Sequence, residues 1–274
     1  MEPLPLSEIL QSPTIALVVG STEKPGVQPV TYHVHEAVLI QSSDYFKQLL
    51  NSNFSENVKK GVQLDSAVDT PQACQLFLDF AYHGRCDPPK TPNALLSYGE
   101  AYLFGEKILA TEFKKYVYEQ AREEAERSFR DLDFSFKTIK TMDPLSKGRV
   151  ELLETWGLLV EKIYTGTYDY KDRYIDEAAP SDASTPFKEH LESMKHLLET
   201  DGVDMFRGLL SQFCAQYPLI IASSPRMMRL HRTTPEFAAD IYDHQMKITL
   251  QELEEAQIYA APHHYAVTSR KVVR

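Results

Sequence analysis

Apolar and polar residues follow a strand-like rhythm near the start of the chain. Residues 14–20 form a β-branched apolar run, which is typical of a buried strand. Residues 21–29 contain Pro25-Gly26 and other turn formers, and residues 30–35 alternate between the two faces of a second strand. The pattern therefore predicts a two-stranded hairpin.

Helical spacing takes over after the hairpin. Ser43 is a good N-cap for a helix with Phe46 on its inner face, and Thr70, followed by proline, is a second cap. Phe77 and Phe80 fall on the inner face of that later helix, so all three phenylalanines are expected in the core. The predicted elements are helices at 36–40, 43–50, 70–82, 92–103 and 111–130, with a short strand at 61–65.

Beyond residue 130 the apolar pattern is helical only. Apolar residues at three- and four-residue spacing recur within 150–163, 187–198 and 203–213, and a last helix opens at Thr234 and carries apolar residues to 248. Residues 168–186 are polar and weakly periodic, which predicts a loop, and the end of the chain after about 257 looks frayed. We therefore expect an all-α C-terminal half.

Two ion pairs are expected on the helix at 111–130. Glu123 stands four residues before Arg127, and Glu126 stands four residues before Arg130. Residues four apart face each other on a helix, and this order of charges is the favourable one.

Acidic charge is spread evenly over the chain, whose formal net charge is −10. Residues 1–120 carry nine basic against fourteen acidic side chains, and residues 121–274 carry twenty against twenty-five. Nucleic-acid binding draws most of its affinity from neutralised phosphates. No nucleic-acid partner is therefore expected.

The 274 residues have the composition of a globular protein, with 43% hydrophobic and 25% charged residues. Cys74, Cys86 and Cys214 are too few and too widely spaced for a disulfide framework, which favours a reducing compartment. No apolar run reaches the roughly 20 residues of a membrane helix, and the first ten residues do not resemble a secretory signal. We expect a cytoplasmic or nuclear protein without membrane contact.

Three segments resemble the BTB/POZ domain family in the right order. TYHVHEAVLIQSSDYFKQLL (31–50) resembles its strand-to-helix signature, with Val34-His35 before Ser43-Asp44-Tyr45-Phe46. The segment 53–86 resembles the following part, with Phe80-Ala81-Tyr82-His83-Gly84, and 95–120 resembles the closing helices, with Gly105-Glu106-Lys107 at their turn. The style is most similar to fungal-type BTB proteins.

The resemblance implies an α+β BTB/POZ fold, in which helices wrap a small mixed sheet, followed by an all-α C-terminal region. The expected organisation is an interaction domain at 10–120, a helical domain at 121–256 and a flexible tail at 257–274. It implies a protein-interaction adaptor or scaffold that self-associates and docks a partner protein. The alternatives are a BTB-containing transcriptional regulator, or an enzyme housed in the helical half.

One triplet carries a more specific implication. Phe54-Ser55-Glu56 matches in position the apolar-x-Glu triplet of BTB proteins that recruit cullin-type ubiquitin ligases. Phe54 would be the anchor that enters a partner pocket, Glu56 a contact at the rim, and Tyr82 a neighbour of both. The other interpretation is that Phe54 folds inward.

The first helix of the chain is expected at a homodimer interface. Leu6, Ile9 and Leu10 give the residues before the first strand an amphipathic pattern. In the family this region packs across a dimer partner, and folding back on its own domain is the alternative. Many members carry an aspartate that contributes to a charged pocket at the dimer base, and Thr14 stands at that position. This chain therefore lacks that aspartate's charge at the expected dimer base.

No catalytic or metal-binding constellation is evident, so we expect no enzyme activity, no cofactor and no metal. The chain lacks a Gly-x-Ser-x-Gly elbow, a phosphate-binding glycine loop and a His-Glu-x-x-His pair. His83 and Cys86 have ligand-like spacing but no second pair, and His35 has only His33 near it. The structural interpretation of His35 is a capping role at the junction of strand and helix. An enzyme would need convergent polar groups within 145–256.

Overall fold

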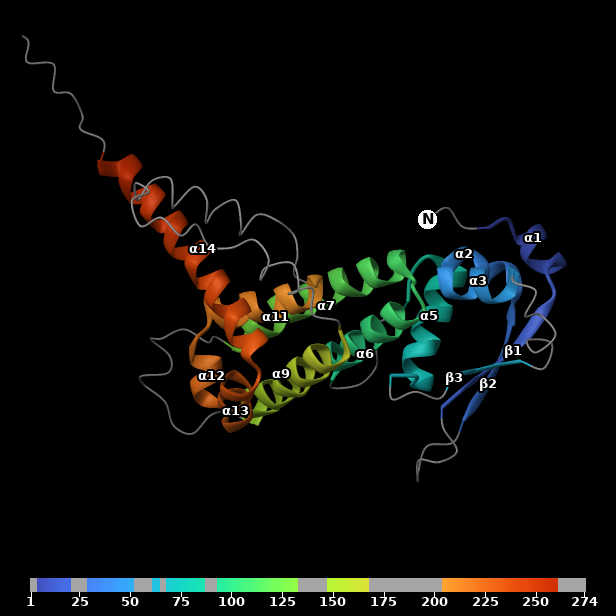
Figure 1. Ribbon diagram of the computed structural model, residues 1–274, viewed down its shortest axis with the longest axis horizontal. Coiled ribbons are helices and arrows are strands. Elements are labelled where there is room, and N and C mark those ends of the chain that lie inside the picture. Colours follow the sequence, from blue (N-terminus) through green and yellow to red (C-terminus); the bar gives the residue numbers. More distant parts are fainter. Residues whose placement is uncertain are drawn as a thin grey trace, which may run out of the picture.

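A computed structural model describes residues 4–20, 29–51, 61–64, 68–86, 93–132, 147–167 and 204–260. Figure 1 shows an elongated molecule with the sheet at one end and a helical bundle at the other. Two long helices, α6 (Ala94–Lys107) and α7 (Thr111–Leu132), connect the two ends.

The sheet has three strands in the order β2-β1-β3. β1 (Thr14–Val19) pairs antiparallel with β2 (Val30–His35) and parallel with β3 (Val62–Leu64). Alternate residues of β1 are buried, because only one face of the sheet is covered by helices. The predicted hairpin and short strand are confirmed.

Helices cover the buried face of this sheet. The helices at this end of the molecule are α1 (Leu6–Gln11), α2 (Glu36–Ser42), α3 (Asp44–Asn51) and α5 (Pro71–His83), together with the end of α6 and the start of α7. Phe46, Phe77, Phe104 and Phe113 meet in the core, with Phe77 5.5 to 6.4 Å from the other three ring centres. Phe46, Phe77 and Phe80 are all buried, which confirms their predicted place in the core.

α7 belongs to both ends of the molecule. Its buried residues stand four apart along the chain, and they are Phe113, Val117, Ala121, Ala125 and Phe129. Phe113 joins the phenylalanines above, whereas Phe129 lies 4.8 Å from Trp156 and 5.0 Å from Phe213 in the bundle. The boundary predicted at 120 therefore falls inside one continuous helix, and one hydrophobic core runs through both regions.

The C-terminal bundle is all helical in the described residues, as the sequence predicts. It comprises α9 (Lys147–Gly166), α11 (Met205–Gln216), α12 (Leu219–Ser223), α13 (Pro225–Thr233) and α14 (Pro235–Ala260). α14 thus includes the first four residues of the segment predicted to be a tail. The predicted loop at 168–186 and the apolar stripe at 187–198 lie outside the described residues. The sequence did not predict α12 and α13.

A buried arginine holds the end of α9. The Arg207 guanidinium donates hydrogen bonds from Nε to Thr167 Oγ1 (2.7 Å) and from Nη2 to the carbonyl oxygens of Thr167 (2.7 Å) and Tyr164 (3.3 Å). It also lies 4.7 Å from the centre of the Tyr164 ring, whose hydroxyl donates to Asp240 Oδ2 at 2.6 Å. The cation thus supplies donors to carbonyls that a helix end leaves open.

The ion pairs on α7 differ from those predicted. Arg127 pairs with Glu124, and Arg122 pairs with Glu119 at 2.8 Å, so each arginine uses the acid three residues before it. The predicted pairs of Glu123 with Arg127 and Glu126 with Arg130 are wrong for this part of the described chain. Three- and four-residue neighbours are both within reach on a helix, and sequence spacing alone does not select between them.

Candidate functional site

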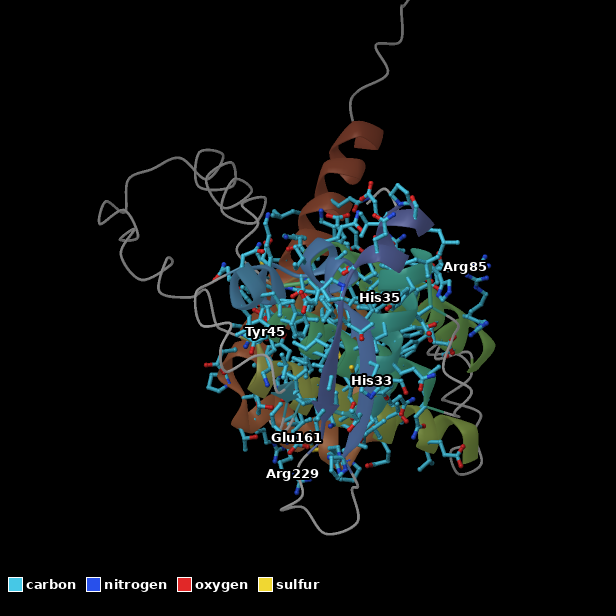
Figure 2. The ribbon with its side chains drawn as sticks, turned by 90° about the vertical axis from the view of Figure 1, so that its right-hand side faces the viewer. His33, His35, Tyr45, Arg85, Glu161 and Arg229 are labelled. Carbon is cyan, nitrogen blue, oxygen red and sulfur yellow. The ribbon has the colours of Figure 1, made fainter. Side chains whose placement is uncertain are left out.

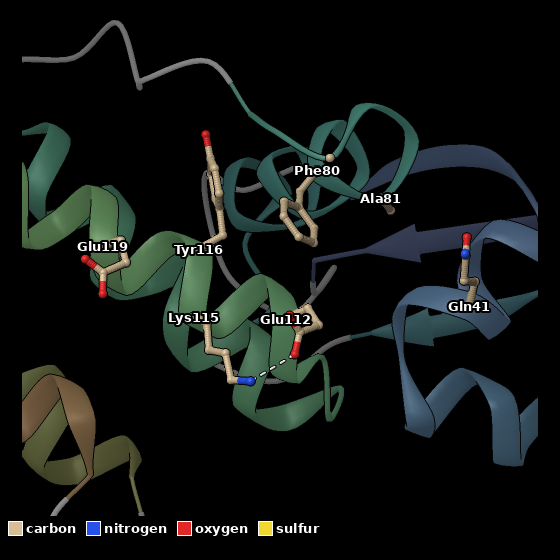
Figure 3. Close-up of a pocket in the computed structure, with 8 residues that line it drawn as sticks. Gln41, Phe80, Ala81, Glu112, Lys115, Tyr116 and Glu119 are labelled. Atoms are coloured by element: carbon tan, nitrogen blue, oxygen red, sulfur yellow. Dashed lines mark hydrogen bonds and ion pairs between the residues drawn. The ribbon is translucent and has the colours of Figure 1, made fainter. Parts of the chain in front are cut away.

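A groove runs between the end of α5 and the first half of α7 (Figure 3). Its volume is about 330 Å³. In Figure 3 the Phe80 side chain points from α5 toward α7, and Gln41 on α2 stands at the far side. Phe80 of α5 and Gly84 at its cap line the groove from one side. The residues that line it from α7 are Glu112, Lys115, Tyr116 and Glu119.

The ends of α5 fix one wall of the groove. The Thr70 hydroxyl accepts a hydrogen bond from the Ala73 amide at 3.1 Å, as its predicted capping role requires. At the other end Gly84 has a φ of +69°, and its amide donates to the Phe80 carbonyl at 2.7 Å. A Cβ there would meet nothing within 4 Å, so glycine serves the backbone turn and the groove stays open beside it.

The floor of the groove is aromatic and fixed. The rings of Phe80 and Tyr116 lie 5.2 Å apart. The Tyr116 hydroxyl donates to the Cys86 carbonyl at 3.1 Å and accepts from the Cys86 amide at 3.4 Å. Burial raises the pKa of Tyr116, so the ring stays neutral and hydrogen-bonded at physiological pH.

The rim of the groove carries charges of both signs. Lys115 Nζ lies 3.0 Å from Glu112 Oε1, and this hydrogen bond lowers the pKa of Glu112. Glu119 stands one turn further along α7 and pairs with Arg122. An aromatic floor within a charged rim suits the contact surface of a partner protein. These residues were not identified from the sequence. A signal was present for Glu112 and Tyr116, because each directly precedes a buried residue of α7 and so lies beside its buried face.

Tyr82 is held by its own domain. Its hydroxyl accepts a hydrogen bond from the His35 amide at 3.1 Å and lies 2.9 Å from His35 Nδ1. His35 is the N-cap residue of α2, but its ring makes no capping hydrogen bond, so that predicted role is wrong. The His35 ring nitrogen instead forms a hydrogen bond with the Tyr82 hydroxyl. This contact links the end of α5 to the junction of β2 and α2. The predicted companions of Tyr82, Phe54 and Glu56, lie outside the described residues.

α1 presents two leucines to solvent and one isoleucine to its own domain. Leu6 is 68% exposed and Leu10 is 67% exposed, whereas Ile9 is buried. The chain after α1 is fixed to α2, because the Ala37 amide donates to Ser12 Oγ at 2.9 Å. In the single chain Ile9 is thus covered by its own domain, and the exposed leucines, one turn apart, form an apolar strip. The dimer interface expected at Leu6, Ile9 and Leu10 stays a prediction.

The described residues contain no group of three or more histidine, cysteine or acidic side chains placed to hold a metal ion. His33 and His35 lie on β2 at the end of the molecule that faces the viewer in Figure 2. His83 Nδ1 lies 3.0 Å from the Asp79 carbonyl of its own helix. Among the helices that the structure describes, none combines the length and the apolar character needed to cross a bilayer.

Comparison with protein families gives one match. Residues 14–120 match the BTB/POZ domain family. A comparison with curated proteins found no match, and the similarity to fungal-type BTB proteins stays a prediction. The mixed sheet, the helices that wrap it and the all-helical region after it are the fold that the resemblance implies. Residues 14–120 are thus a BTB/POZ domain, and α7 carries that domain without a break into the helical region.

Proposed function

We propose that this chain is an interaction adaptor whose BTB/POZ domain self-associates through α1 and docks a partner protein at the groove between α5 and α7. BTB/POZ domains generally serve protein–protein interaction. The observation that carries the proposal is the apolar strip of Leu6 and Leu10, which a folded domain leaves exposed on a helix otherwise fixed to it. Exposed apolar strips of this kind mark contact surfaces.

Self-association through α1 is expected to depend on these leucines. Each is about two-thirds exposed, so its burial in a dimer contributes roughly 1–2 kcal/mol. Leu10→Asp removes this term at both copies and adds a carboxylate that must lose water. We expect the dimer dissociation constant to rise at least about 100-fold, measured by sedimentation equilibrium over a range of concentrations.

Met228→Asp is the matched control for this experiment. Met228 is a 37% exposed apolar side chain on α13, in the C-terminal bundle, and its replacement should leave the dimer unchanged. A wild-type protein that is monomeric at every concentration would refute self-association. Equal dimerisation of wild type and Leu10→Asp would refute the role of α1.

The finer role proposed for the domain is recruitment of a cullin-type ubiquitin ligase scaffold. Its support is the triplet Phe54-Ser55-Glu56, in a chain segment that the BTB/POZ match includes. An aromatic anchor that enters a partner pocket contributes about 1.5–3 kcal/mol, whereas a carboxylate at the rim contributes roughly 0–1 kcal/mol. Phe54 would therefore dominate the contact.

Phe54→Ala is expected to weaken binding of a purified cullin scaffold by about 10- to 150-fold, measured by biolayer interferometry. Glu56→Ala, the comparison within the same triplet, should weaken it no more than about fivefold. Equal affinities for wild type and Phe54→Ala would exclude the anchor. If wild type itself fails to bind, the cullin role is excluded while the general adaptor role stands on the dimer experiment.

A further inference from the structure

A second groove lies between α7 and α11, mostly beyond the residues that match the BTB/POZ family. Its volume is about 470 Å³, within the range of ligand-binding clefts. Leu209 and Phe213 of α11 are buried at its floor, and Tyr217 stacks on Phe129 at 5.5 Å. The walls are polar, so the groove has a fixed aromatic base and chemically specific sides.

One wall is a single row of side chains on α7. Tyr118, Arg122, Glu126 and Arg130 stand four residues apart, and each directly follows a residue of the buried stripe. Glu112 of the first groove instead directly precedes a buried residue. With about 100° between successive helical residues, the two grooves flank opposite sides of the buried stripe. The two rims meet at the ion pair of Glu119, which lines the first groove, and Arg122, which lines the second.

The row carries an ordered charge pattern of base, acid, base. Four helical residues rise about 6 Å, so the three charges repeat at that interval. Arg122 pairs with Glu119, but both side chains are nearly half exposed, and such a surface pair contributes only about 0–1 kcal/mol. Among the described residues neither Glu126 nor Arg130 forms an ion pair. The pattern is therefore available to a partner.

The opposite wall offers hydrogen bonds without charge. Gln212 and Gln216 stand one turn apart on α11, and both are exposed. Each amide can donate and accept, so this wall is compatible with polar side chains of either kind. The order of charges that the groove selects is therefore set by α7.

We propose that this groove binds a helix of a partner protein that presents acid, base and acid at four-residue spacing. Such a helix repeats its charges every 6 Å or so and matches Arg122, Glu126 and Arg130 in register. The pattern reads the same in both directions, so either orientation fits. A purely acidic segment would face Glu126 with a like charge, and an extended strand repeats at about 6.6–6.8 Å and drifts out of register.

The test uses fluorescently labelled, alanine-based peptides of about 20 residues, long enough to form a helix. One carries Glu, Lys and Glu at four-residue spacing, and a second carries Lys, Glu and Lys at the same spacing. A third carries Glu, Lys and Glu at two-residue spacing, with threonine in place of alanine to favour an extended chain. Binding is measured by fluorescence anisotropy. Wild type should bind the first peptide at least about tenfold more tightly than either other peptide.

Charge reversal on the protein supplies the decisive comparison. Arg122→Glu with Arg130→Glu should lose at least tenfold in affinity for the first peptide and gain affinity for the second, because the row then reads acid, acid, acid. Both side chains are exposed, so circular dichroism should show an unchanged fold. Arg229→Glu with Arg232→Glu, at two exposed arginines of α13, is the matched control and should bind the first peptide like wild type.

Three outcomes would overturn the proposal. Wild type could bind none of the peptides at concentrations up to about 1 mM, it could bind the first two equally, or it could prefer the peptide with two-residue spacing. The first outcome would show that the groove does not bind a helix. The second would show that the groove does not select the order of charges, and the third that its partner is not helical. None of these results bears on dimerisation through α1.

Discussion

Arg207→Ala is expected to lower the free energy of unfolding by about 3 kcal/mol. The guanidinium is 4% exposed and supplies the donors for the carbonyls of Tyr164 and Thr167 at the end of α9. Without it these carbonyls and the Thr167 hydroxyl stay buried without their donor, at about 1–3 kcal/mol for each unsatisfied group. Urea unfolding followed by fluorescence measures the loss, since Trp156 is the single tryptophan and is fully buried in the bundle.

Two further variants separate this cause from others. Arg207→Lys keeps the charge but loses the planar fork of donors, so we expect an intermediate loss of about 1–2 kcal/mol. Arg229→Ala removes an exposed arginine of the same region and should change stability by no more than about 0.5 kcal/mol. If Arg207→Ala costs no more than Arg229→Ala, the arginine does not support the end of α9.

Local signals in the sequence were sufficient for the first half of the fold. Thr70 and Gly84 mark the two ends of α5 because a hydroxyl cap and a left-handed glycine act within one turn of chain. The β-branched apolar run at 14–20 predicts β1, in which every second residue is buried. The short helices α12 and α13 were missed, since two helices separated by a single residue leave no clear break in the apolar pattern.

The candidate site was less accessible to sequence reasoning. The family resemblance, not the spacing, implied a dimer interface at Leu6, Ile9 and Leu10, and of these Leu6 and Leu10 are exposed whereas Ile9 is buried. Tyr82 was expected beside Phe54, but nothing in the spacing indicated its hydrogen bond to His35, 47 residues away. Both grooves along α7 were missed because each is formed with a helix distant in sequence, and amphipathic spacing describes one helix at a time.

The contact between the BTB/POZ domain and the helical region depends on a glycine. Gly99 lies on α6, where a Cβ would stand 2.0 Å from Leu159 Cδ1 and 3.8 Å from Phe206 Cζ. Leu159 lies on α9 and is fully buried, so its side chain has packed neighbours on every side. The close approach of α6 and α9 therefore requires a residue without a side chain at position 99.

Gly99→Ala is expected to lower the free energy of unfolding by about 1 kcal/mol. Overpacking a filled core costs about 1–3 kcal/mol, and here the added methyl forces α6 and α9 apart. The helix preference of alanine over glycine, about 1 kcal/mol, opposes this loss without cancelling it. Urea unfolding followed by both circular dichroism and Trp156 fluorescence measures the change across the whole chain and in the bundle.

Gly208→Ala is the matched control, because a Cβ on Gly208 of α11 would meet nothing within 4 Å. The same substitution there should leave stability unchanged or raise it by up to about 1 kcal/mol, so the two variants are expected to differ in sign. In the double variant Gly99→Ala with Leu159→Ala, the new methyl enters space that the leucine vacates. Its loss should fall short of the sum of the single losses by at least about 1 kcal/mol. Additive losses would mean that α6 and α9 do not meet at these two residues.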